Sequence, residues 1–193
     1  MADINSDVAD NLRFGGKPGG RRIAKSSPPD EALVAIVELL FFAYRDFTHE
    51  PDEILAQFGF GRAHHRVLHF VNRRPGMRVA DLLDILHITK QSLARVLKEL
   101  VDRGFIQQEA GPRDRRERRL HLTAKGRRLA GELVKLQKAR IKQALTNPET
   151  NPDASEVVRH FLLGMIGAEH RAEVFSVVGG GDIGAAGASE GNR

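Results

Sequence analysis

The chain has 193 residues, a formal net charge of +5, 41% hydrophobic residues and no cysteine. This length suits one core-forming domain with extensions, and the missing cysteine excludes disulfides, thiolate catalysis and cysteine-ligated zinc. Residues 1–25 lack a signal-peptide core, and the most apolar run, residues 33–44, is too short for a membrane span and contains Glu38, so we expect a soluble, cytoplasmic protein.

The N-terminal part of the chain divides into an arm and a helix. Residues 1–27 are polar and rich in glycine, which predicts a disordered arm. A helix is expected to begin near Ser27, with proline and acidic residues in its first turn, and to run to about His49. Its apolar side chains occupy two faces, and such a helix needs burial on more than one side. We therefore interpret residues 28–60 as an N-terminal dimerisation helix.

Three shorter helices are expected next, at about residues 61–72, 79–87 and 90–103, and only Ile88 and Thr89 separate the last two. Glycine at position 104 ends the third of them. Two short strands, residues 105–109 and 118–122, enclose a polar turn. The apolar residues of the third helix repeat at the three/four spacing of a buried stripe: Leu93, Val96, Leu97, Leu100 and Val101.

This order of elements predicts a mainly α fold, a winged helix-turn-helix with a small β-hairpin wing, over residues 61–128. A long helix over residues 124–145 begins after Thr123. A last helix over about residues 153–175 is expected to bury Val158, Phe161, Leu162, Met165 and Ile166. We interpret residues 129–176 as C-terminal dimerisation helices and residues 177–193 as a disordered tail.

The positive charge is concentrated in one segment. Residues 89–128 contain twelve lysines and arginines but only five acidic residues, which is the pattern of a polyanion-binding surface. The exposed face of the second helix of the helix-turn-helix is expected to contact DNA through Thr89, Lys90, Gln91, Ser92, Arg95 and Lys98. The wing is expected to contact the minor groove through Arg113, Arg115, Arg116 and Arg118, with Asp114 pairing with a neighbouring arginine to hold the loop.

These motifs resemble the MarR-type transcriptional regulators. The resemblance rests on Gly76 with the Leu82-Leu83 helix, on the segments at residues 88–93 and 100–106, on the wing at residues 114–118, and on Leu122-Thr123-Ala124-Lys125-Gly126. It covers about residues 60–136. It implies a homodimer with interlocked terminal helices that binds near-palindromic operators, usually as a repressor, and often releases DNA when a small effector binds.

The sequence gives less support to a metal site, an enzyme or a protein-contact module. His65 and His69 have the i, i+4 spacing of zinc ligands, but no third ligand lies nearby in the sequence, so we expect neither metal nor cofactor. No nucleophile–base pair or carboxylate pair indicates an enzyme. The alternative is a winged-helix module for protein contacts or an architectural role, although such a module does not need an arginine-rich wing. The expected partners are double-stranded DNA, a second copy of the chain and a small effector, with no membrane.

Overall fold

The computed structural model describes residues 27–112, 114, 116–147 and 152–179. The expected arm and tail therefore lie almost wholly outside the described residues. Residues up to Leu40 and residues from Phe41 on form two compact units. The elements in chain order are α2 (Asp30–Ala56), α3 (Arg62–Arg73), β1 (Met77–Arg78), α4 (Val79–Leu86), α5 (Lys90–Asp102), β2 (Ile106–Ala110), β3 (Arg118–Leu122), α6 (Ala124–Leu145), α7 (Ala154–Met165) and α8 (Ala168–Gly179).

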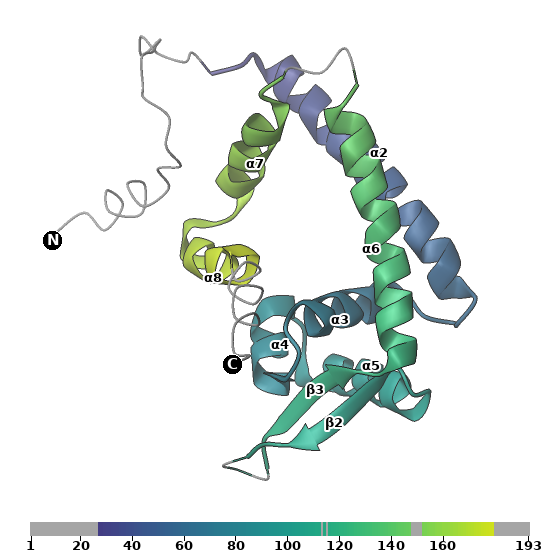
Figure 1. The fold of residues 1–193 in the computed structure, drawn as a ribbon. Coiled ribbons are helices and arrows are strands. Elements are labelled where there is room, and N and C mark those ends of the chain that lie inside the picture. The colour runs from purple at the N-terminus through teal and green to yellow at the C-terminus, as the bar shows by residue number, and fades with distance from the viewer. Residues whose placement is uncertain (1–26, 113, 115, 148–151, 180–193) are drawn as a thin grey trace, which may run out of the picture. The chain divides into compact units, whose positions relative to one another are not determined.

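The order confirms the mainly α winged helix-turn-helix class, which Figure 1 shows as helices α3 to α5 followed by a β-hairpin. Among the described residues, no helix is both long and apolar enough to cross a membrane.

The first helix is longer than expected. The prediction that it ends near His49 was wrong, because α2 continues through Pro51 to Ala56. A proline inside a helix removes one backbone hydrogen bond. Here Pro51 and Leu55 are both buried, and this burial keeps the last turns of the helix in place. The helix is also tied to α6, because the Arg140 guanidinium lies 2.8 Å from the Glu50 carboxylate.

The core of the winged domain lies between α3, α4, α5, α6 and the sheet. The apolar stripe of α5 faces this core as predicted, with Leu93, Val96, Leu97 and Leu100 buried and Val101 partly buried. Full burial of each Leu or Val contributes about 1.5–3 kcal/mol to folding, so this stripe fixes which face of α5 remains exposed. The chain leaves α5 through Gly104, whose φ of 70° is the left-handed conformation that glycine adopts most easily.

The sheet has three antiparallel strands in the order β1-β3-β2. Strand β1 was not expected from the sequence. It has only two residues, and Met77 and Arg78 pair with Leu120 and Arg119 of β3. This pairing fixes β3 against the segment that leads into α4, and the end of the hairpin near Ala110 and Arg118 extends away from the helices (Figure 1).

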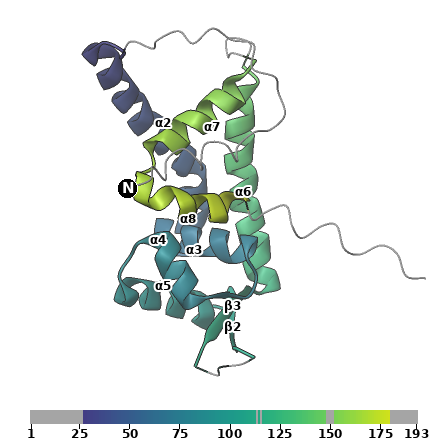
Figure 2. The ribbon, with the colours of Figure 1, turned by 90° about the vertical axis from the view of Figure 1, so that its left-hand side faces the viewer.

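The C-terminal region departs from the prediction in two ways. The single helix expected over residues 153–175 is two helices, because Ile166 has an extended backbone and Gly167 follows it. Four of the five side chains expected to be buried are exposed: Val158, Phe161, Leu162 and Met165. Only Ile166 is partly buried. Among the described residues, none covers this apolar face of α7. Helix α8 lies beside α4, as Figures 1 and 2 both show.

Candidate nucleic-acid interface

The N-terminal end of α5 is held by two of the residues assigned to DNA contact. The Thr89 hydroxyl oxygen accepts a hydrogen bond from the Ser92 backbone N–H at 3.1 Å, and its O–H donates to Ser92 Oγ at 2.9 Å. This N-cap satisfies one of the free N–H groups of the first turn. Thr89 and Ser92 thus fix the direction of the helix, and both residues remain exposed beside its positive end.

The remaining polar residues of α5 differ in whether their side chains form hydrogen bonds or ion pairs. Lys90, Gln91 and Arg95 are exposed, and no side-chain hydrogen bond or ion pair engages them within the part of the chain that the structure describes. Lys98 is different, because its Nζ lies 2.5 Å from Asp102 Oδ2 one turn along the same helix. The hydrogen bond and the charge of Asp102 raise the pKa of Lys98. We therefore expect Lys98 to contribute less to DNA contact than Arg95 does.

The wing is a short loop closed by its own backbone. The Gly111 N–H donates to the Glu117 carbonyl at 3.0 Å, and the Glu117 N–H donates to the Asp114 carbonyl at 3.1 Å. Asp114 was expected to pair with a neighbouring arginine and hold the loop. Its Oδ1 accepts a hydrogen bond from the backbone N–H of Arg116 at 2.8 Å, and the Arg116 side chain is exposed. Arg118 is exposed as well, whereas the assigned residues Arg113 and Arg115 lie outside the described part of the loop.

Several other basic residues of the positive segment have structural contacts. The Arg103 guanidinium donates to the Phe58 carbonyl and lies over the Phe60 ring at 4.4 Å. Lys125 donates to the Arg103 carbonyl at 3.1 Å, and Arg119 is paired with Glu117 at 2.9 Å. The count of charges in the sequence could not separate these residues from the exposed cations. The strand β2 packs against α5, so the exposed face of α5 and the wing belong to one packed unit.

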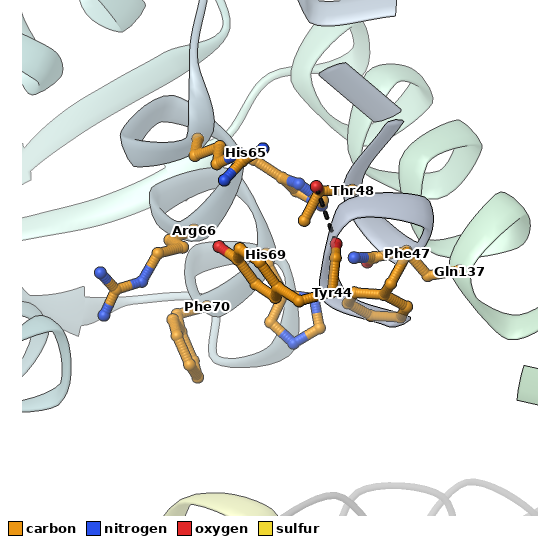
Figure 3. A pocket seen from close by; sticks show the side chains of 9 residues that line it. Tyr44, Phe47, Thr48, His65, Arg66, His69, Phe70 and Gln137 are labelled. Carbon is orange, nitrogen blue, oxygen red and sulfur yellow. Dashed lines mark hydrogen bonds between the residues drawn. The ribbon is translucent and has the colours of Figure 1, made fainter. Parts of the chain in front are cut away.

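A cavity of about 420 Å³ lies between α2, α3 and α6. Figure 3 shows aromatic side chains from α2 facing the histidines of α3. The lining residues are Tyr44, Phe47, Thr48, Arg62, His65, Arg66, His69, Phe70 and Gln137. The neighbours of His65 and His69 in this cavity could not be predicted from sequence spacing, because the other walls come from helices distant in the chain.

Both histidines of this cavity have lowered pKa values. Burial lowers the pKa of His65, and the nearby His69 lowers it further. Burial also lowers the pKa of His69. Both rings are thus favoured as neutral donors and acceptors. Within the described residues, no group of three metal-ligating side chains includes either histidine.

One lining residue connects the cavity to the helix-turn-helix. Arg66 donates from Nη2 to the carbonyl of Leu86 at 3.0 Å, and Leu86 is the last residue of α4. Thr89 follows three residues later as the N-cap of α5. A change at Arg66 therefore acts directly on the end of α4 that leads into α5.

Comparison with known proteins agrees with this geometry. Residues 58–117 match the family model described as MarR family. The HTH-type transcriptional regulator PetP of Rhodobacter capsulatus is 50% identical over 129 residues, which is 67% of this chain and 76% of that protein.

Two solved structures share the fold. A MarR variant from E. coli complexed with operator DNA has a TM-score of 0.55 at 19% identity, covering 73% of this chain and 100% of its own. Streptococcus pneumoniae FabT in complex with DNA has a TM-score of 0.61 at 18% identity, and the match covers 69% of this chain and 94% of the FabT chain.

Proposed function

Because the chain belongs to the MarR family of helix-turn-helix transcriptional regulators, we propose that it binds near-palindromic operator DNA as a homodimer and represses transcription there. The observation that carries this proposal is the pair of exposed cationic surfaces on one packed unit. Lys90 and Arg95 project from α5, and Arg116 and Arg118 from the wing. A helix of this kind fits the major groove, and an arginine-tipped hairpin fits the minor groove.

Exposed apolar side chains support the proposal that a second copy of the chain forms a homodimer. In α2, Leu39, Phe41 and Phe42 are 56–71% exposed, and in α7, Leu162 and Met165 are 50% or more exposed. Large apolar side chains that are exposed together are typical of interaction surfaces. We assign them to a dimer interface formed by residues 28–60 and 129–176. A two-fold dimer would present two α5 helices to successive major-groove turns, about 34–36 Å apart, which is why an inverted repeat is expected.

We further propose that a small effector binds in the cavity lined by Tyr44 and His69. Aromatic walls favour a flat apolar ligand, and the adjacent Arg62 and Arg66 favour a negative charge on it. Arg62 is already bound to Asp52 at 2.9 Å. Among the described residues, Arg66 is held by the carbonyl of Leu86 alone, so an anionic ligand would compete with that carbonyl and loosen the end of α4.

The effector proposal has a direct optical test. The chain has one tyrosine and no tryptophan, so its intrinsic fluorescence comes from Tyr44 in the cavity wall. Titration with small aromatic carboxylates, beginning with benzoate, should change this fluorescence and weaken DNA binding in parallel. If fluorescence and DNA binding stay constant across such a panel, the cavity has no effector role of this class.

The DNA-binding proposal is tested by selecting bound sequences from random duplex DNA. The expected result is one enriched inverted repeat whose half-sites are about one helical turn apart. The Arg95→Ala variant should enrich a consensus that is relaxed at one position in each half-site. Absence of any enriched sequence would instead favour the protein-contact or architectural function.

A further inference from the structure

Three metal-ligating side chains from two helices meet at one point of the surface. His87 is the C-cap residue of α4, and His170 and Glu173 lie one turn apart on α8. One ligand atom from each of the three lies within 4.8 Å of the other two. His87 Nε2 and Glu173 Oε2 are 3.7 Å apart, and the two imidazole rings have centroids 4.9 Å apart.

These separations are close to those in a metal site. Tetrahedral zinc with ligands about 2.1 Å away requires donor atoms about 3.4 Å from one another. Small side-chain rotations therefore bring all three donors to bonding distance without moving either helix. Two imidazoles with one carboxylate are a common zinc ligand set, and they leave a fourth position for water. This ligand set binds zinc and neighbouring transition metals in preference to magnesium or calcium.

The surroundings leave space for an ion and its water. A hollow of about 470 Å³ lies at this place, and both His87 and Glu173 line it. Asp84, one turn before His87 on α4, also lines the hollow and adds a negative charge, while Lys90 on its rim opposes an ion. All three ligand side chains are partly exposed, so an ion can enter from solvent.

The backbone at His87 brings its ring to this point. Its φ of 49° is the only positive value for a residue other than glycine within the described part of the chain. This left-handed conformation costs free energy for most residues, and it turns the chain at the end of α4 toward the N-cap of α5. The same turn directs the His87 ring toward α8.

We propose that His87, His170 and Glu173 bind a divalent transition-metal ion, with zinc as the preferred ion, and that the ion fastens α8 to the helix-turn-helix. Arg171 of α8 donates to the carbonyls of Ile166 and Gly164, but α8 has few contacts with the helix-turn-helix, and none of residues 168–178 is buried. The Arg74 guanidinium contacts the Ser176 carbonyl near the far end of α8. The ion would supply a second attachment of α8 to the helix-turn-helix, at His87, two residues before the N-cap residue Thr89.

The test uses the full-length protein, first freed of metal with a chelator. Zinc binding is measured by calorimetry, and cobalt(II) is added as a spectroscopic probe of coordination. We expect one ion per chain, with visible cobalt bands typical of a four- or five-coordinate site. His170→Gln and Glu173→Gln should each weaken binding at least about tenfold. His87→Asn should do the same, and asparagine tolerates the left-handed backbone, so this variant keeps the fold.

The matched control is His160→Gln on α7. His160 lies 3.9 Å from Glu156, so it forms a histidine–carboxylate pair that belongs to no three-ligand group in the described chain. This variant should bind zinc as the parent does. Hydrogen exchange should show zinc-dependent protection of α8 in the parent and in His160→Gln but not in His170→Gln. Absence of stoichiometric binding, binding that survives all three ligand substitutions, or unchanged α8 protection would each overturn the proposal.

Discussion

His64 Nε2 lies 3.0 Å from Glu99 Oε2 and joins α3 to α5. The other ring nitrogen, Nδ1, accepts a hydrogen bond from the Gly61 N–H at 3.1 Å. In the neutral ring, Nε2 therefore carries the hydrogen and donates it to the carboxylate. The His64 side chain is only 11% exposed and stacks on the Phe60 ring with centroids 4.5 Å apart. Helix α3, which lines the cavity, is thus bonded to α5.

Removing this acceptor should destabilise the protein. Glu99→Ala leaves the buried Nε2–H without a partner, and we expect the free energy of unfolding to fall by about 1–3 kcal/mol. Glu99→Gln keeps an acceptor oxygen and should lose less. Urea denaturation at one fixed protomer concentration measures both, since dimer stability depends on concentration. Glu132→Ala on the exposed side of α6 is the control, and equal losses for Glu99→Ala and Glu132→Ala would show that the bond is not stabilising.

Gly126 is required by close contact rather than by backbone conformation. A Cβ at this position would collide with the carbonyl oxygen of Phe105, which also accepts the Thr123 N–H at 3.0 Å. Gly126→Ala should therefore cost about 1–3 kcal/mol or more, because the obstacle is backbone. Gly131→Ala is the matched control on the same helix, where a Cβ meets nothing within 4 Å. It should be neutral or stabilise by up to about 1 kcal/mol. Thermal unfolding of both variants, at one protein concentration, separates these outcomes.

Much of the winged domain could be predicted because periodicity and capping act locally. The bounds of α6 and the buried face of α5 follow from Thr123, from the apolar spacing and from Gly104. Strand β1 could not be predicted in this way, because two residues carry no alternation and their pairing with β3 is decided by the fold. The end of α2 could not be predicted from local sequence, because Pro51 lies inside the helix and the burial of Pro51 and Leu55 outweighs the local effect of proline.

The sites depend even more on contacts between distant segments. The sequence indicated which residues of α5 are polar, but only the fold shows that Lys98 is paired with Asp102 and that Thr89 acts as a cap. The group formed by His87 and His170 has no signal in sequence spacing, because its members lie on helices far apart in the chain.

The dimer proposal predicts the behaviour of the exposed face of α7. The parent should sediment as a dimer at micromolar concentration, with more than about 2,000 Å² buried in total. Phe161 is 43% exposed in the single chain, and Phe161→Asp should raise the dimer dissociation constant at least about thirtyfold, as expected for an interface hot spot. Gln108→Asp adds the same charge at an exposed position outside both assigned interface ranges and should leave the dimer intact. A parent protein that sediments as a monomer would contradict the proposal.

The cavity histidines should make stability depend on pH. Burial lowers the pKa of both His65 and His69 below the ordinary 6.5, with Asp52 acting in the opposite direction on His65. The unfolded chain then binds more protons than the folded chain as the pH falls through this range. Their contribution to stability is complete above about pH 6.5 and is lost as the pH falls below it.

Denaturation midpoints between about pH 7.5 and pH 5.5 measure this dependence. The His65→Gln and His69→Gln double variant should show a flatter profile than the parent. The exposed His160→Gln should follow the parent curve. A double variant with the parent slope would assign the pH dependence to other groups.

We expect α5 and the wing to contribute differently to DNA binding. Arg95 and Gln91 are expected to read bases, so Arg95→Ala or Gln91→Ala should cost about 1–3 kcal/mol on the selected operator and relax one position of it. Arg116 is exposed at the wing tip, and Arg116→Ala should weaken operator and scrambled DNA alike while lowering the salt slope by about one per lost phosphate contact. Lys138→Ala removes an equal charge from the exposed side of α6 and should change neither quantity. Binding isotherms at several salt concentrations, on both duplexes, distinguish the two patterns. If Arg116→Ala binds both duplexes as tightly as the parent at every salt concentration, the wing does not contact DNA, even where α5 does.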